Sequence, residues 1–372
     1  MTVDYEIVET VERLEEVIKL TRNADAVAID TEFARFNTYY PIVGLIQIFD
    51  GEYCYLIDPI EVPELGAIVD LLEDESVVKV FHACSEDLEV FHHVLQAVPS
   101  PLFDSQVAAA ALGVNFSISY QKLVAHFLDL QISKEETRSD WLQRPLSAAQ
   151  LDYAALDVIH LLEVYRKLVS QLNEANKLTW VQQECKGMTG SIATDVDPSL
   201  AYQRVKGLAR LDAESQYLVQ AICAWREVKA REVDVPRNRV VDEASVVAIA
   251  QLNYLEVGGL HTHTSMSSRQ IRKYGDELLV VINEARMVPS EDRPQLAKES
   301  MPVSNSLMKQ LKLRVSVRAE ALSIAPEMLA RRRHLEQLLR SGLEGGTYQL
   351  PPDLCGWRKA VIGDELMDLL AQ

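Results

Sequence analysis

The sequence has few cysteines, no long apolar run and few basic residues in its first half. The scattered cysteines, none at the spacing of a metal site, are Cys54, Cys84, Cys185, Cys223 and Cys355. Their odd number suits a reducing compartment. No apolar run reaches the roughly 18–20 residues that span a membrane, and the acidic N-terminus lacks the pattern of a signal peptide. We therefore expect a cytoplasmic protein without a membrane partner.

The charge is strongly negative overall but unevenly distributed. The net charge is −18, and residues 1–175 contain 11 Lys and Arg against 30 Asp and Glu. The remainder contains 26 against 25 and includes basic clusters. Because phosphate binding depends on the local field rather than on the total charge, the acidic composition does not exclude a nucleic-acid partner.

The pattern of apolar residues divides the chain into an α/β half and a helical half. Short runs rich in Val, Ile, Phe and Tyr alternate with helical periodicity up to about residue 185. This order predicts an α/β layered domain with a mixed sheet, and the first three strands follow one another closely enough to form hairpins. The small, polar stretch 186–200 is interpreted as a linker.

After the linker the strand signal disappears and a second polar stretch, 288–303, divides the helical half. A weak repeat relates residues 225–232 to residues 313–320 at an offset of 88. It suggests two copies of one small helical domain. With the 372 residues expected to form two or three domains, we expect boundaries at 1–188, 204–288 and 300–372.

Two acidic motifs lie at the ends of predicted strands. Asp30 and Glu32 alternate along the first strand, so their side chains share one face with Cα atoms about 6.6 Å apart. Asp87 falls in the first turn of a helix that we expect to begin near Ser85. Each motif has a plain structural explanation, because strand ends are solvated and acids at a helix N-terminus are favoured by the macrodipole.

A third acidic motif lies on a predicted helix. Ser147 and Gln150 have the spacing of a capping box, so a helix should begin at Ser147. Tyr153 and Asp157 then share a face, one turn apart. If the three motifs meet at one end of the sheet, four carboxylates form a hard, oxygen-rich site suited to Mg²⁺ or Mn²⁺. Pairs of such ions are the usual machinery of phosphodiester hydrolysis.

The three motifs resemble those of the DEDD superfamily of 3′→5′ exonucleases, tyrosine subclass. The segments are D-T-E at 30–32, H-A-C-S-E-D-L-E at 82–89 and Y-A-A-L-D-V at 153–158. Residues 25–165 are similar to bacterial ribonuclease D over most of their length. The helical half resembles the helicase-and-RNase-D C-terminal (HRDC) domain, with residues 300–372 similar to a divergent second copy.

The resemblance implies an RNase H-like exonuclease domain followed by two all-α HRDC-type domains. It implies that Asp30 bridges two divalent ions, Mg²⁺ or Mn²⁺, that Glu32 and Asp157 complete the first site, and that Asp87 holds the second ion through water. It also implies that Tyr153 positions the attacking water. The expected activity is 3′→5′ exoribonuclease trimming of RNA 3′ ends, with tRNA precursors as the typical substrate and 5′-mononucleotides as products. We expect a monomer.

Basic residues of the helical half are candidates for RNA contacts, although some are ordinary solvated charges. The candidates are Arg226, Lys229, Arg231, Arg237, Arg239, Arg269, Arg272, Lys273, Lys309, Lys312, Arg314 and Arg331–Arg333. In the first half Arg35, Lys134, Arg138 and Arg144 could contact phosphates or pair with local acids.

Two alternatives remain open from the sequence. The first is a DNA 3′→5′ exonuclease, which the absence of a Walker-type phosphate-binding motif or a polymerase segment disfavours. A single contact to the ribose 2′-hydroxyl could decide between RNA and DNA. The second is a nucleic-acid binding module with an inactive nuclease fold, which the presence of all four acids and Tyr153 disfavours.

Overall fold

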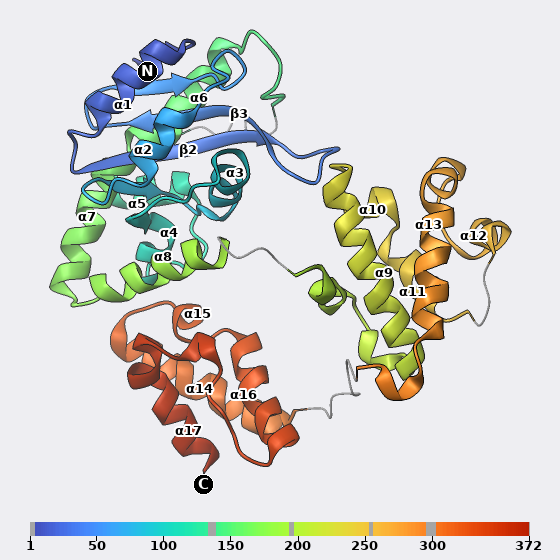
Figure 1. Cartoon of the computed structure of the whole chain (residues 1–372). Helices are drawn as coiled ribbons and strands as arrows, with labels where there is room; N and C mark the ends of the chain where they lie inside the picture. The colour runs from blue at the N-terminus through green and yellow to red at the C-terminus, as the bar shows by residue number, and fades with distance from the viewer. Residues whose placement is uncertain (1–3, 133–138, 193–196, 253–255, 295–302, 372) are drawn as a thin grey trace. The chain divides into compact units, whose positions relative to one another are not determined.

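The computed structural model describes residues 4–132, 139–192, 197–252, 256–294 and 303–371 (Figure 1). The chain divides into two compact units. The first contains residues 1–34, 41–194 and 303–372, and the second contains residues 35–40 and 195–302. Residues 35–40 form the tip between two strands of the first unit, yet they belong to the second unit by their contacts.

A six-stranded mixed sheet forms the centre of the first unit. Its strands are β1 (Glu6–Val8), β2 (Ala26–Ala34), β3 (Ile42–Phe49), β4 (Cys54–Ile57), β5 (Val78–Phe81) and β6 (Leu102–Asp104). The spatial order is β1-β4-β3-β2-β5-β6. The pairs β2–β3 and β3–β4 are antiparallel, whereas β1–β4, β2–β5 and β5–β6 are parallel. The predicted mixed sheet with its early hairpins is confirmed.

Helices of the first unit accompany the sheet along the chain. They are α1 (Val11–Thr21), α2 (Gly66–Leu72), α3 (Ser85–Leu95), α4 (Ser105–Ala111), α5 (Tyr120–Leu128), α6 (Ala148–Ile159), α7 (Leu161–Glu174) and α8 (Leu178–Ile192). Because α8 continues to Ile192, the prediction of a linker from residue 186 is wrong for its first residues. In the part of the chain that the structure describes, no helix is both long enough and apolar enough to cross a bilayer.

The C-terminal helices pack into the core of the first unit, which the sequence did not indicate. These are α14 (Asn305–Leu322), α15 (Pro326–Leu329), α16 (Arg332–Gly345) and α17 (Asp364–Leu370). Trp357 stacks on Trp180 of α8 with ring centroids 4.6 Å apart, and Arg358 donates two hydrogen bonds to Glu184 at 2.5 and 2.6 Å. The Lys177 ammonium donates hydrogen bonds to the carbonyl oxygen of Ala111 at the end of α4 and to that of Ser323 directly after α14.

The second unit is a helical bundle around its own apolar cluster. Its α-helices are α9 (Ala213–Glu232), α10 (Arg237–Val240), α11 (Glu243–Ala250), α12 (Val257–His263) and α13 (Ser268–Met287). Leu218, Ile222, Leu278 and Ile282 come from α9 and α13 and are buried in this cluster. The helical character predicted for residues after the linker is confirmed.

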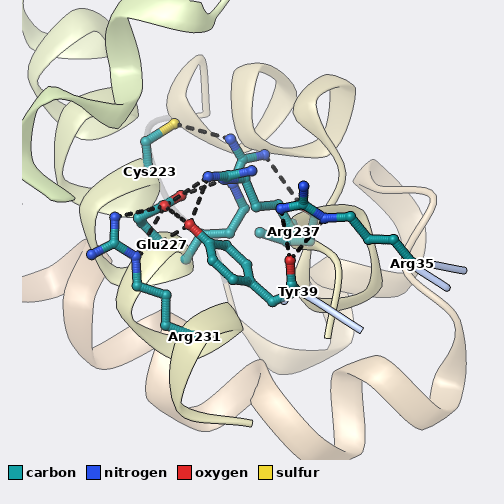
Figure 2. A network of polar contacts seen from close by, with 8 residues as sticks. Arg35, Tyr39, Cys223, Glu227, Arg231 and Arg237 are labelled. Carbon is teal, nitrogen blue, oxygen red and sulfur yellow. Dashed lines mark hydrogen bonds and ion pairs between the residues drawn. The ribbon is translucent and has the colours of Figure 1, made fainter. Parts of the chain in front are cut away.

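A buried acid on α9 connects the strand tip 35–40 to the rest of the second unit. Figure 2 shows Glu227 between the guanidinium groups of Arg231 and Arg237, with the hydroxyl of Tyr39 pointing toward the same carboxylate. Arg237 Nη2 donates to Glu227 Oε1 at 2.7 Å and to the Tyr39 hydroxyl at 2.8 Å. Asp234 accepts the backbone N–H groups of Tyr39 and Tyr40 at 2.9 and 3.0 Å.

The surroundings of Glu227 keep its carboxylate ionised. Burial raises the pKa of Glu227, but the hydrogen bonds from Arg237 and Tyr39 and the charges of Arg237 and Arg231 outweigh this effect and lower the pKa to about 2. Because the ordinary value is 4.5, the ionised carboxylate stabilises the folded state above about pH 4.5. This contribution is lost as the pH falls toward about 2.

We expect Glu227→Gln to lower the free energy of unfolding of the second unit by about 3 kcal/mol at neutral pH, because two half-buried cations lose their buried anion. Hydrogen exchange of the α9 amides in the full chain measures this effect. Glu232→Gln on the same helix is the control, since Glu232 forms an exposed pair with Lys229. The difference between the Glu227 variant and wild type should shrink below pH 4; a difference that persists there would contradict the assigned ion pair.

Candidate active site

Strand β2 places two acids on one face at the middle of the sheet. It pairs with β3 on one side and with β5 on the other, and Asp30 and Glu32 lie opposite Gln47 and Leu45 of β3. The side-chain period of two residues brings both carboxylates to the same face. The β2–β3 register shifts directly after Glu32, so the regular ladder is interrupted at the end of this acidic segment.

Helix α6 supplies the third acid. Ser147 caps the helix by accepting the N–H of Gln150 at 3.2 Å, and the Gln150 side chain accepts the N–H of Ser147 at 3.0 Å. This capping box fixes where the helix begins, and the predicted start is therefore confirmed. It also sets Tyr153 and Asp157 one turn apart, where the Tyr153 hydroxyl is close enough to lower the pKa of the Asp157 carboxyl group.

The structure brings Asp30, Glu32 and Asp157 together. One carboxylate oxygen from each of the three residues lies within 4.8 Å of those from the other two. The side chains come from β2 and α6, which are more than 100 residues apart in the sequence. A group of carboxylate oxygens this close is the donor set that hard divalent cations prefer.

The carboxylates also shift one another's titration. Burial raises the pKa of Asp30 well above its ordinary range, and the charges of Asp87, Asp157 and Glu32 raise it further. Burial together with Asp157 and Asp87 raises the pKa of Glu32 to about 9. Burial raises the pKa of Asp157 to about 7, although the hydrogen bond from Tyr153 opposes the shift. Such a group can be fully ionised near neutral pH only if cations compensate its charge, so these residues fit a divalent metal site.

Asp87 borders this group without belonging to the set within 4.8 Å. It is buried in the first turn of α3 and accepts a hydrogen bond from the Thr31 hydroxyl at 2.5 Å. Burial raises its pKa to about 6, and the bond from Thr31 opposes this shift. Its charge still raises the pKa values of Asp30 and Glu32, so it lies close enough to contribute to the field of the site.

Sequence reasoning missed the residues that shape the turn before α3. The helix begins at Ser85, but the N-cap is Cys84, which makes no side-chain cap, and Ala83 has a positive φ of 60°. The buried carboxylate of Asp104 accepts the N–H groups of Ala83 and Cys84 and so supports this turn. Asp104 comes from the end of β6, a three-residue strand that carried no recognisable sequence signal.

The basic residues proposed for phosphate contacts in the first half have other partners or lie outside the described residues. Arg144 donates two hydrogen bonds to the buried Asp58 at 2.5 and 2.7 Å. Arg35 donates to the carbonyl oxygen of Tyr39. Lys134 and Arg138 lie outside the residues that the structure describes. The local Arg–carboxylate pairing considered from the sequence therefore holds for Arg144.

Family models match both halves of the chain. A model described as 3′-5′ exonuclease matches residues 5–173, and a model of the HRDC domain matches residues 215–282. The first range contains the whole mixed sheet and all four acids. The fold and the site together define a 3′→5′ exonuclease.

A third model, described as Ribonuclease D, C-terminal HRDC domain, matches residues 302–366. The chain is 42% identical to ribonuclease D of Pseudomonas paraeruginosa over 350 residues, which cover 94% of this chain and 93% of that protein. The chain belongs to the ribonuclease D family and is a 3′→5′ exoribonuclease.

Solved structures give the same result. The crystal structure of Escherichia coli RNase D, described as an exoribonuclease involved in structured RNA processing, matches with a TM-score of 0.92 at 34% identity and covers 99% of each chain. The catalytic core of RRP6 from Trypanosoma brucei matches with a TM-score of 0.61 at 26% identity and covers 77% of this chain and 80% of that chain. The expected RNase H-like exonuclease domain with HRDC-type helical domains is confirmed.

The bond between Thr31 and Asp87 leads to a stability prediction. We expect Thr31→Val to lower the free energy of unfolding of the first unit by roughly 1–3 kcal/mol, because a buried carboxylate loses a donor. Thr31→Ser keeps the hydroxyl and serves as the control. Urea denaturation of both full-length variants at neutral pH measures the difference. A valine variant as stable as the serine variant would show that the hydrogen bond contributes nothing.

Proposed function

We propose that this exoribonuclease binds two divalent ions, Mg²⁺ or Mn²⁺, through Asp30, Glu32, Asp87 and Asp157, and that Tyr153 acts with them as the fifth catalytic residue. The observation that carries the proposal is the approach of three carboxylates to within 4.8 Å of one another, with Tyr153 one helical turn before Asp157. We also propose RNA 3′ ends, including those of tRNA precursors, as substrates and 5′-mononucleotides as products.

The proposed metal ligands come from three elements of the first unit. Asp30 and Glu32 are fixed by the hydrogen-bonded ladder of β2, while Asp157 is fixed by the capped helix α6. Asp87 is restrained by Thr31. Divalent ions bound here would activate water and neutralise negative charge on the scissile phosphate. The chain itself holds the ligands in place before substrate arrives, which lowers the reorganisation needed during the reaction.

Tyr153 is suited to orienting a water molecule rather than to transferring a proton. Burial and the charges of Asp157 and Glu32 raise the pKa of its phenol far above neutral pH. The phenol therefore stays protonated beside Asp157, and its oxygen lone pairs are available to accept a hydrogen bond from the attacking water. We assign Tyr153 this positioning contact.

The cellular context is also a proposal. All five cysteines are free thiols in the structure, and four of them are buried. Free thiols are typical of proteins in reducing compartments, which supports action in the cytoplasm. We propose that the protein acts there as a monomer.

The metal-site proposal is tested with Asp30→Asn and Asp157→Asn. We expect each to reduce the rate at which 5′-labelled RNA is shortened by roughly a hundredfold or more, and to weaken Mn²⁺ binding measured by calorimetry. In chelator both variants should be at least as stable as wild type, because one repelling charge is removed. Asp152→Asn on α6 makes the same charge change outside the site and is the control. Normal turnover and normal Mn²⁺ binding in the two site variants would refute the site.

A matched single-stranded DNA in the same assay separates RNA from DNA as the substrate. Shortening of RNA with little shortening of DNA supports RNA 3′ ends as the substrate. Equal or preferred hydrolysis of DNA would instead favour the alternative of a DNA exonuclease.

Tyr153→Phe tests the positioning contact separately. We expect turnover to fall by about a hundredfold with unchanged Mn²⁺ affinity, because the ring still packs while the hydroxyl is removed. Calorimetry and single-turnover hydrolysis measure the two quantities. A wild-type rate in this variant would remove Tyr153 from the reaction.

A further inference from the structure

A pocket of about 440 Å³ lies in the second unit, and three segments distant in the sequence form its walls. Asn37 comes from the strand tip 35–40, and Arg239 comes from α10. The first turns of α13 contribute Arg269 and Lys273. The pocket therefore combines three cations with the tip of the hairpin that also carries the active-site acids of β2.

Six of the cations that the sequence suggested for RNA are engaged in contacts within the protein. The engaged residues are Arg226, Lys229, Arg231, Arg237, Arg314 and Arg332. Their charges are neutralised by nearby acids or, for Arg226, buried against a carbonyl oxygen. A bound polyanion would have to displace these partners, so the six residues are poor candidates for a binding surface.

The pocket cations differ from this group. Arg239, Arg269 and Lys273 are exposed, and none of the ion pairs between described residues includes them. Asp234 directly precedes the pocket residue Val235. Its carboxylate accepts hydrogen bonds from the backbone N–H groups of Tyr39 and Tyr40. Three uncompensated positive charges around one cavity create a local field that attracts an anion.

The position of the pocket on α13 strengthens this field. Ser267 and Gln270, which form the capping box at the start of this 20-residue helix, both line the pocket. The positive end of the helix macrodipole therefore lies at the cavity. The Gln270 side chain also donates to the carbonyl oxygens of Asn238 and Arg239, which ties α10 to α13 and fixes the spacing between the cations.

The strand tip adds an aromatic side chain beside the pocket. Phe36 directly precedes the pocket residue Asn37 and exposes 73% of its surface. The backbone around it is held, because Arg35 bonds to the carbonyl oxygen of Tyr39 and the Tyr39 ring is fixed by the Glu227 network (Figure 2). An exposed aromatic ring, carried on a restrained backbone one residue from a cationic pocket, is the combination by which proteins bind single-stranded nucleic acid.

We propose that this pocket binds a phosphodiester group of single-stranded RNA through Arg239, Arg269 and Lys273, and that Phe36 stacks on an adjacent base. The inference rests on the proposed function, since RNA is the polymer that the site would hold. Phosphate contacts position a strand without reading its sequence, so the pocket serves RNAs of different sequence alike. Of the several basic clusters that the sequence offered as candidates for RNA contacts, the pocket cluster is thus the one assigned.

The test measures binding of a fluorescent single-stranded oligouridine to the full chain by anisotropy in chelator, where hydrolysis does not interfere. Arg269→Glu together with Lys273→Glu should weaken binding by roughly tenfold or more. The slope of log Kd against log salt concentration should fall by about 0.7 for each phosphate that the variant no longer neutralises. Glu at the start of α13 suits the helix macrodipole, so the helix should remain folded.

Arg204→Glu together with Lys206→Glu is the matched control. Both residues are exposed in the second unit, outside the pocket, and the change in net charge is identical. We expect this control to leave the affinity within a factor of about two. An equal loss of affinity in both double variants, or no loss in the pocket variant, would overturn the proposal.

Two further variants probe separate parts of the site. Phe36→Ala should weaken binding by about tenfold with an unchanged salt slope, because it removes stacking but no charge. Unchanged affinity in this variant would contradict the stacking contact. Arg239 lies on α10, so Arg239→Gln leaves α13 unchanged. This variant should reduce both affinity and salt slope even if the α13 variant proves unstable. Wild-type affinity and slope in this variant would count against the pocket.

The binding assay tests the pocket and the hydrolysis assay tests the proposed function, so either proposal can be refuted without the other. If wild type binds oligouridine through the pocket but does not shorten it with Mg²⁺ or Mn²⁺, the proposed function fails while the pocket stands. If wild type shortens RNA and the pocket variants bind normally, the proposed function stands and the pocket assignment is wrong.

Discussion

Mutual repulsion of carboxylates is the constraint on which the first unit depends. Asp30, Glu32 and Asp157 have oxygens within 4.8 Å, and burial together with neighbouring charge raises the pKa values of all three. Such a cluster does not stabilise the fold, so other interactions must hold it. The central position of β2 between two hydrogen-bonded neighbours and the capping box of α6 provide that rigidity. The same repulsion favours binding of a divalent cation, so the feature that destabilises the fold is also the one that suits the group to a metal site.

The parts of this site that the sequence predicted are the parts fixed by local geometry. The period of two residues in a strand places Asp30 and Glu32 on one face whatever the rest of the fold does. A capping box at Ser147 fixes the register of α6, and hence the common face of Tyr153 and Asp157. The convergence of the two elements was inferred from the resemblance to a family, because no local rule relates positions more than 100 residues apart.

The parts that the sequence did not predict depend on distant partners. Nothing near Thr31 indicates that its hydroxyl bonds to Asp87, and nothing near Glu227 distinguishes a buried ion-pair centre from an acid on a solvated helix. The C-terminal helices gave an ordinary helical pattern, yet they pack against α8 through Trp357 and Arg358. Apolar periodicity reports which face of a helix is buried, but it does not report what covers that face.

The distribution of partners, rather than the count of charges, decides where a polyanion can bind. The chain has a net charge of −18, and several cations of the second unit are already paired with acids. Glu227 has a central position in this distribution, because it neutralises Arg231 and Arg237 while its bond to Tyr39 fixes the strand tip. The cations around the α13 pocket form no ion pair among the described residues, and Asn37 of the fixed tip lines the same pocket directly after the exposed Phe36. A buried acid thus favours the proposed anion site by pairing with competing cations and by ordering the strand tip next to those that remain.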